Sequence, residues 1–289
     1  MKPKQDTAMI PLLNQHASRR GFLKSAALGA AALQFGLPAL LAADKKIPVG
    51  LQLYSVRKDC EKDLPKVLET VGKIGYKGVE FAGYYNRKAS ELRKMLDDNG
   101  LVCCGTHTPL DTIKPENLEA TIEFNKTIGN KNLIVPYMDP KTREGWLEMV
   151  ELFNKQAEKV KSAGMRVGYH AHAHDFQKLD GVSCWDIFFG GTHDDVVMQL
   201  DTSNCMDGGA NPVEVLKKYN KRAVTIHIKE WGGKSDAVIG EGKVDFPAVF
   251  DICEHNGVTE WYVLEHEREE DAIENVRRSF EALKKLGKV

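Results

Sequence analysis

The chain has 289 residues, of which 28% are charged and 42% hydrophobic, and its formal net charge is −1. This balance argues against a nucleic-acid-binding protein, because such a protein needs a basic surface to displace the counterions of the phosphates. The length suits one large domain, and no Pro/Ser/Gly-rich linker or low-complexity tract follows residue 50.

The first 43 residues predict an export signal. The motif SRRGFLK at 18–24 precedes an Ala/Gly/Leu-rich stretch that ends in small residues at Ala43, which is typical of a twin-arginine signal peptide. A membrane anchor is the alternative, but a lysine, a glutamine and a proline interrupt the stretch. We therefore expect the twin-arginine export machinery as a partner, no stable membrane anchor, and a periplasmic or extracytoplasmic domain over 44–289.

From residue 49 onward, short apolar or β-branched runs alternate with longer segments of helical periodicity. Strands are predicted at 49–55, 78–83, 101–107, 132–137, 166–172, 197–203, 223–229 and 261–267. Helices are predicted at 64–74, 89–99, 117–128, 142–163 and 247–255, with only short helical pieces in 181–195 and 212–219. Eight such units in about 245 residues predict an α/β fold, a (β/α)8 TIM barrel rather than an open doubly wound sheet.

The cysteines predict no disulfide framework, although an exported protein could form one. They lack C-x-x-C spacing, and two of them are neighbours on one strand, where side chains point to opposite faces. We expect free thiols in the core at Cys60, Cys103, Cys104, Cys184, Cys205 and Cys253.

Most predicted strands end in ionisable residues, where an ordinary core would place aliphatic ones. Taken singly, each allows a structural interpretation: a paired carboxylate, a satisfied pocket histidine or a solvated rim residue. In a barrel, however, the carboxyl ends of all strands meet at the active site. The residues concerned are Glu80, His107, His170, His172, Asp201, His227, Lys229, Glu265 and Glu267.

Four of these residues predict a metal centre. His170, Asp201, His227 and Glu265 belong to four consecutive strands, so their side chains would converge at one end of the barrel. Two imidazoles and two carboxylates suit Zn²⁺, Mn²⁺, Co²⁺ or Fe²⁺. The run HAHAHD at 170–175 could instead be a surface tract, but a strand period of two favours His170 and its second neighbour both pointing inward.

Several motifs resemble the sugar phosphate isomerase/epimerase group within the xylose isomerase-like TIM barrel superfamily, over essentially all of the mature chain. They are QLYSVR (52–57), GYKGVEFAGYY (75–85), GTHT (105–108), GYHAH (168–172), QLDTSN (199–204), HIKE (227–230), GEGKVDF (240–246) and YVLEHE (262–267).

The resemblance implies a metal held by residues on strands five to eight. In the superfamily these are a glutamate, an aspartate, a histidine and a second glutamate. The last three correspond to Asp201, His227 and Glu265, whereas the fifth-strand position holds His170, as in a branch that reads GYHNH. Epimerases of the superfamily use both glutamates as an acid/base pair, and here one of them is absent.

The implied chemistry is enolisation of a free sugar or keto-sugar. A divalent ion that binds a carbonyl and the adjacent hydroxyl acidifies the intervening C–H by stabilising an enediolate. We expect Glu265 or Glu80 to remove the proton, with His107, His172 or Lys229 stabilising or reprotonating oxygen. Return of the proton makes an isomerase or epimerase. Loss of a β-substituent makes a lyase or dehydratase, acting on a 3-keto-glycoside or an inosose-like substrate.

A non-catalytic sugar-binding protein and a DNA-repair endonuclease of the same superfamily are further alternatives; the intact ligand set argues against the first, and the lack of a basic groove against the second. Aromatic residues near the strand ends suit either a pyranose face or the interface of a homo-oligomer. The residues expected to contact a carbohydrate substrate are Gln52, Tyr54, Asp175, Glu267 and Trp231.

Overall fold

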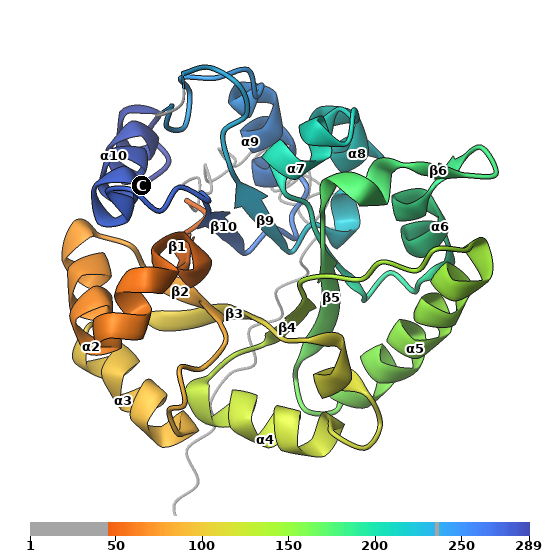
Figure 1. Ribbon diagram of the computed structural model, residues 1–289, viewed down its shortest axis with the longest axis horizontal. Coiled ribbons are helices and arrows are strands. Elements are labelled where there is room, and N and C mark those ends of the chain that lie inside the picture. The colour runs from red at the N-terminus through yellow and green to blue at the C-terminus, as the bar shows by residue number, and fades with distance from the viewer. Residues whose placement is uncertain (1–45, 235–236) are drawn as a thin grey trace, which may run out of the picture. The chain divides into compact units, whose positions relative to one another are not determined.

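The computed structural model describes residues 46–234 and 237–289, in which helices surround a ring of parallel strands (Figure 1). The predicted signal segment lies outside the described residues. The sheet has eight strands in the order β8-β5-β4-β3-β2-β1-β10-β9, and neighbouring strands pair in parallel. Their bounds are β1 Val49–Gln52, β2 Gly78–Ala82, β3 Val102–His107, β4 Asn132–Val135, β5 Arg166–His170, β8 Val197–Gln199, β9 Thr225–Ile228 and β10 Trp261–Leu264.

The barrel closes beside the predicted metal ligands. The first and last strands of the sheet order, β8 and β9, meet through a bridge between Asp201 and His227. The backbone N–H of His227 donates to the carbonyl of Leu200 at 2.9 Å. These contacts confirm the TIM barrel, and they place two of the predicted ligands on the seam that completes it.

Each strand is followed by a helix, as the sequence predicts. These helices are α2 Arg57–Ile74, α3 Ala89–Asp98, α4 Leu118–Ile128, α5 Arg143–Lys161, α6 Cys184–Gly191, α8 Pro212–Tyr219, α9 Phe246–His255 and α10 Ala272–Lys285. Shorter elements sit in the loops: the helix α7 Thr202–Asp207, the hairpin β6 Lys178–Leu179 with β7 Val182–Ser183, and the 3-10 turns η1 Leu53–Val56, η2 Leu110–Ile113, η3 Ala173–Phe176 and η4 Asn220–Arg222. None of the helices within the described residues is long and apolar enough to cross a membrane.

All eight barrel strands are shorter than the sequence runs that predict them, and at two of them the structure shows why. The run 49–55 leaves the sheet after Gln52, whose side chain caps η1 by accepting from the N–H of Tyr54 at 3.0 Å. The run 166–172 ends at His170, and His172 caps η3. In both places a side chain, that of Gln52 or Asp175, accepts from a nearby backbone N–H and so competes with the strand ladder. Both segments therefore turn away from the sheet at the mouth of the barrel.

One helix begins earlier than predicted. The sequence places it at 64–74, whereas α2 spans Arg57–Ile74 with an irregular residue, Asp63, inside it. The Asp63 carboxylate accepts from the N–H of Lys66, and Pro65 lies in the first turn beyond it. Both features mark a helix start, so the predicted boundary corresponds to the break between two merged helices.

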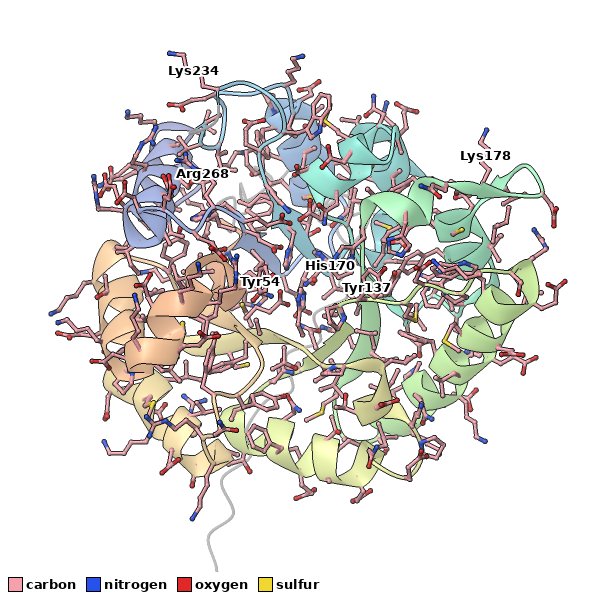
Figure 2. All side chains as sticks on the ribbon, in the orientation of Figure 1. Tyr54, Tyr137, His170, Lys178, Lys234 and Arg268 are labelled. Atoms are coloured by element: carbon pink, nitrogen blue, oxygen red, sulfur yellow. The ribbon has the colours of Figure 1, made fainter. Side chains whose placement is uncertain are left out.

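The apolar core lies mainly between the strands and the helices, where large side chains such as Trp146, Phe153 and Phe188 are fully buried. The six cysteines are all free and buried, in agreement with the prediction. Polar side chains concentrate inside the ring, at the carboxyl ends of the strands. In Figure 2, Tyr54, His170 and Tyr137 lie toward the centre of the barrel, whereas Lys178 and Lys234 lie at its edge.

Candidate metal centre and active site

The four predicted metal ligands converge. One ligand atom from each of His170, Asp201, His227 and Glu265 lies within 4.8 Å of the others, and all four residues are buried. His170 ends β5, Asp201 follows β8, His227 lies within β9, and Glu265 follows β10. Because these strands are neighbours around the ring, residues up to 95 positions apart in sequence meet at one end of the barrel.

Asp201 carries the observation that fits a cation best. One carboxylate oxygen, Oδ1, accepts from the N–H of Asn204 at 2.7 Å, whereas buried Oδ2 has no hydrogen-bond partner among the described residues. Burial raises the pKa of Asp201 to about 6. A buried carboxylate oxygen without a hydrogen bond is costly, and a divalent ion among two imidazoles and two carboxylates would satisfy it.

His227 sits between two carboxylates. Its Nε2 lies 2.5 Å from Oε2 of Glu80, and its Nδ1 lies 2.5 Å from Oε2 of Glu265. Burial alone would lower the pKa of the ring, but Glu80 and Glu265 together raise it to about 10. With both ring nitrogens protonated, the side chain bridges the carboxylates. To bind a metal through Nδ1 it would release that proton and keep its bond to Glu80.

Gln199, which was not among the predicted site residues, orients two of the histidines. Its Nε2 donates to Oε1 of Glu80 at 2.9 Å, which fixes the orientation of the amide because a carboxylate only accepts. Its Oε1 therefore accepts from Nδ1 of His170 at 3.0 Å and from Nε2 of His107 at 2.9 Å. This arrangement leaves Nε2 of His170 unprotonated and available to a metal. Gln199 lies two residues before Asp201, and a strand period of two puts both side chains on the same face, so this spacing could have identified Gln199 from the sequence.

Glu80 and Gln52 lie beneath the cluster and are fully buried. Nε2 of Gln52 donates to Oε2 of Glu80 at 2.8 Å. Burial alone would raise the pKa of Glu80, but the charges of His107 and His227 lower it well below its usual range. Gly105 leaves room for this carboxylate, because a Cβ at that position would overlap Oε1 of Glu80. Glu80 thus contacts the rings of His107 and His227, Gln52 in turn orients Glu80, and neither side chain is exposed.

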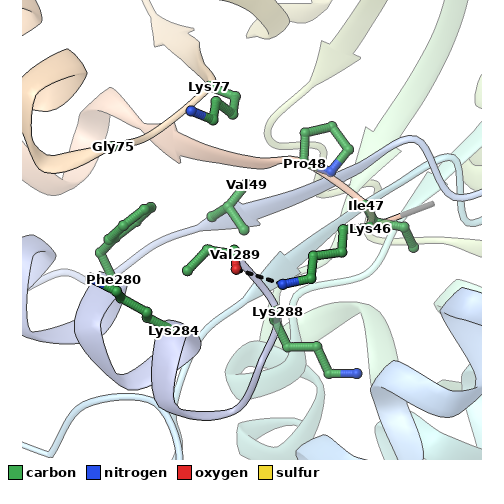
Figure 3. Close-up of a pocket in the computed structure, with 10 residues that line it drawn as sticks. All are labelled: Lys46, Ile47, Pro48, Val49, Gly75, Lys77, Phe280, Lys284, Lys288 and Val289. Carbon is green, nitrogen blue, oxygen red and sulfur yellow. Dashed lines mark hydrogen bonds between the residues drawn. The ribbon is translucent and has the colours of Figure 1, made fainter. Parts of the chain in front are cut away.

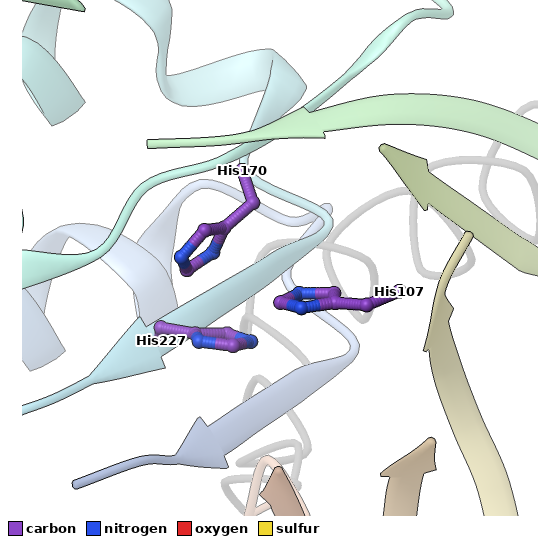
Figure 4. Close-up of side chains that lie close together, drawn as sticks. All are labelled: His107, His170 and His227. Carbon is purple, nitrogen blue, oxygen red and sulfur yellow. The ribbon is translucent and has the colours of Figure 1, made fainter. Parts of the chain in front are cut away.

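Three histidine rings converge in Figure 4. The ring of His107 stacks on that of His227 at a centroid distance of 5.3 Å and lies 4.8 Å from that of His170. Nε2 of His107 also lies 3.2 Å from Oε2 of Glu80. His107, which the sequence predicted near the reacting oxygens, is thus part of the same polar network.

Lys229, the residue directly after β9, lies beside the cluster. Its ammonium group donates to Oδ1 of Asn204 at 3.2 Å, pairs with Glu267, and lies 3.9 Å from Oδ2 of Asp201. Burial would lower its pKa, but Asp201, Glu265 and Glu267 raise it above its usual value. Lys229 therefore remains a cation next to the cluster, whereas the side chain of Glu267 is 61% exposed at the rim.

The loop after β5 is held by Asp175. Its oxygens accept from the hydroxyl of Tyr169 at 2.8 Å and from the N–H of His172 at 2.6 Å, and the residue is fully buried. We therefore place Asp175 behind the loop rather than at the substrate surface. The ring of His172 packs against that of His170 at 5.0 Å, and burial lowers the pKa of His172 to about 4.

The two predicted aromatic contacts differ. Tyr54 is 43% exposed at the carboxyl end of β1, with the guanidinium of Arg57 4.1 Å from its ring centroid. Trp231 is only half-buried in the loop after β9, and its indole N–H donates to Asp207 at 2.6 Å. Tyr54 is thus free to meet a ligand, whereas Trp231 ties its loop to the end of α7.

A separate cavity of about 520 Å³ lies away from this site (Figure 3). Ile47, Val49 and Phe280 form its apolar part, and Lys46, Lys77, Lys284 and Lys288 line it as well. Because Val49 begins β1, this cavity is at the amino end of the strands, opposite the cluster. Active sites of TIM barrels are found at the carboxyl end.

The fold and the cluster together define a parallel α/β barrel with a candidate metal centre at the carboxyl ends of its strands. Residues 68–286 match the family model of the xylose isomerase-like TIM barrel. The chain belongs to this family.

Relatives with established names support the same assignment. Inosose dehydratase of Clostridium botulinum (strain Alaska E43 / Type E3) is 25% identical over 278 residues, covering 78% of this chain and 91% of that protein. The rhizopine catabolism protein MocC of Rhizobium meliloti is 22% identical, covering 71% and 75%. A sugar phosphate isomerase/epimerase from Parabacteroides distasonis ATCC 8503 is 26% identical, with a TM-score of 0.71 over 87% of this chain and 98% of that one. The zinc-binding IOLI protein, at 15% identity and a TM-score of 0.64, shares the fold and covers 83% and 98%.

Proposed function

We propose that the protein is a metal-dependent lyase or dehydratase that enolises a keto-sugar or keto-polyol and then eliminates a β-substituent. His170, Asp201, His227 and Glu265 would hold the divalent ion, as Mn²⁺, Zn²⁺, Co²⁺ or Fe²⁺. When bound, the ion supplies Lewis-acid polarisation of the substrate carbonyl and its neighbouring oxygen. The buried Oδ2 of Asp201, which has no hydrogen-bond partner among the described residues, supports this assignment.

The observation that carries the choice of reaction is the number of accessible carboxylates. Epimerisation through a planar enediolate requires acid/base groups on both faces of the substrate. Here Glu80 and Asp201 are fully buried, and the fifth-strand position holds His170. Glu265, at 7% exposure, is the least buried carboxylate of the cluster. A single carboxylate suits elimination, in which one group can serve both proton transfers.

In such a reaction Glu265 would accept one proton and give the same proton back. Glu265 takes the proton from the carbon next to the carbonyl, and the electron pair of that C–H bond becomes the new C=C bond. The bond between the β-carbon and its oxygen breaks, and the departing oxygen takes the proton from Glu265. The products are an unsaturated ketone and water or an alcohol. Lys229 offers a fixed positive charge to the oxygens that become negative.

Isomerisation is a second candidate, because one base can also return the proton to the neighbouring carbon on the same face. The named isomerase/epimerase from Parabacteroides distasonis supports it as an alternative, whereas the inosose dehydratases support elimination. The SRRGFLK motif supports a further part of the proposal, that the mature enzyme acts outside the cytoplasm on free rather than phosphorylated carbohydrate.

Incubation with metal and substrate in deuterated water tests the proposal. The purified protein is analysed for bound metal and then given an inosose, 3-keto-glucose or an aryl 3-keto-glucoside, with NMR as the readout. We expect an unsaturated ketone and released water or phenol, all lost after EDTA treatment. Deuterated isomer without release would select isomerisation. Sugar binding without exchange would indicate a non-catalytic binding protein.

A further inference from the structure

A line of aromatic rings leads from the buried cluster to solvent. The ring of His170 lies 4.5 Å from that of His227 and 5.0 Å from that of His172. The next ring, that of Tyr137, lies 5.2 Å from His172 in an edge-on arrangement. Exposure rises along the line, from 0% at His227 and 2% at His170 to 53% at Tyr137. Tyr137 is therefore two ring contacts away from a candidate metal ligand and is open to ligands.

Tyr137 is held in place although it is exposed. It follows the end of β4, and its ring also lies 5.0 Å from that of His174, whose Nε2 donates to the carbonyl of Met138 at 2.7 Å. Its hydroxyl lies 3.4 Å from Oδ2 of Asp139. An aromatic ring that is fixed before binding loses little entropy when a ligand stacks on it.

Exposure of such a ring is unusual in this barrel. Among the described residues, the large hydrophobic side chains that are exposed include two aromatic ones, Tyr54 and Tyr137, and both follow barrel strands at the carboxyl end. Both lie toward the barrel centre in Figure 2. Rings with one free face at the mouth of a site offer an apolar surface to the ring of a ligand.

We propose that Tyr137, flanked by His172 and His174, forms an outer subsite for the leaving group of the substrate. The inference rests on the proposed elimination, and it specifies the substrate class as a keto-glycoside that carries an aryl group or a second sugar ring. The keto-sugar ring would occupy the cluster, and the departing ring would stack on Tyr137. Small substrates that lose only water would leave this subsite empty.

The test compares Tyr137→Ala with Tyr137→Phe in the metal-loaded mature protein. Their kcat/KM is measured on p-nitrophenyl 3-keto-glucoside and, as deuterium exchange, on free 3-keto-glucose. We expect Tyr137→Ala to lower kcat/KM at least tenfold more for the aryl glycoside than for the free sugar, mainly through a higher KM. Tyr137→Phe keeps the ring and should stay within about threefold of the parent protein. Leu147→Ala, which changes another exposed side chain (43%) on the outer helix α5, is the control and should leave kcat/KM unchanged for both substrates.

Equal losses on both substrates, or no loss on either, would overturn the subsite. Failure of the proposed elimination would look different, because the unaltered protein would then release no p-nitrophenol from the aryl glycoside. In that event, saturation-transfer NMR with p-nitrophenyl glucoside still decides the matter. Aryl signals enhanced with Tyr137→Phe and absent with Tyr137→Ala support the subsite, and equal signals refute it.

Discussion

Two buried glutamines give the sharpest prediction about the polar network. Gln199 and Gln156 are both 0% exposed, but their side chains differ completely in hydrogen bonding. Neither Nε2 nor Oε1 of Gln156 has a partner among the described residues. The same substitution, glutamine to leucine, is nearly isosteric at both positions. It should therefore destabilise the protein at Gln199 and stabilise it at Gln156.

The expected magnitude follows from the bonds of Gln199. It makes four, to Glu80, Thr225, His107 and His170, at 2.9 to 3.0 Å. A neutral bond contributes about 1 kcal/mol and one to a charged group about 1.5–3 kcal/mol, so Gln199→Leu should cost about 4–6 kcal/mol. At Gln156, leucine removes the penalty of two unpaired buried groups and should add about 1–3 kcal/mol.

The assay is urea unfolding of the EDTA-treated variants, followed by circular dichroism. The two variants should differ by at least about 5 kcal/mol, or roughly 10–20 °C in Tm for a domain of this size. Metal affinity, measured separately, should fall about 10–100-fold in Gln199→Leu, because the ring orientation of His170 is no longer fixed. It should be unchanged in Gln156→Leu. Equal stabilities for the two variants would refute the network as described.

The remaining predictions concern the ligands, the base, acid stability and export. Asp201→Ala should abolish metal binding, measured by plasma emission, with the circular dichroism spectrum retained; unfolding at room temperature would contradict this. Glu265→Gln should keep sugar affinity within about tenfold and lower turnover by about two decades or more, and near-normal turnover would remove Glu265 as the base. The pKa of Glu265 is lowered to about 2, because its bond to His227 outweighs burial. Its contribution to stability is therefore present above the unfolded value of about 4.3 and declines as the pH falls toward 2, so Glu265→Gln in EDTA should flatten the stability profile below pH 4.3. Lysine at both Arg19 and Arg20 should leave the protein in the cytoplasm on fractionation, and normal export would contradict a twin-arginine signal.

Local sequence patterns were sufficient to predict the barrel architecture. Each predicted strand carries its own apolar run, and the helix predicted at 117–128 ends at Gly129, which has the left-handed φ of 78° that a helix end requires. These signals depend on near neighbours in the chain. The ends of strands were less predictable, because the side chains of Gln52 and Asp175 accept from local backbone N–H groups and the chain turns out of the ladder there.

The sequence by itself determined that ionisable residues lie at or just after the carboxyl ends of the strands, and the barrel rule then predicted that four of them would lie together. It identified His170, Asp201, His227 and Glu265 correctly as one cluster. The number of bonds that each side chain makes across the ring was not accessible in the same way, because those partners are set by register and barrel closure.

Only the tertiary structure therefore showed that Glu80 is enclosed by donors, that Gln199 orients two histidines, and that Asp175 faces a buried tyrosine. It also showed that Tyr137, a residue with no distinctive motif, is exposed beside the cluster. Residue type and spacing specify which chemistry is available at the mouth of a barrel. Which groups are free to perform it depends on long-range hydrogen bonds and burial, and these exist only once the ring has closed.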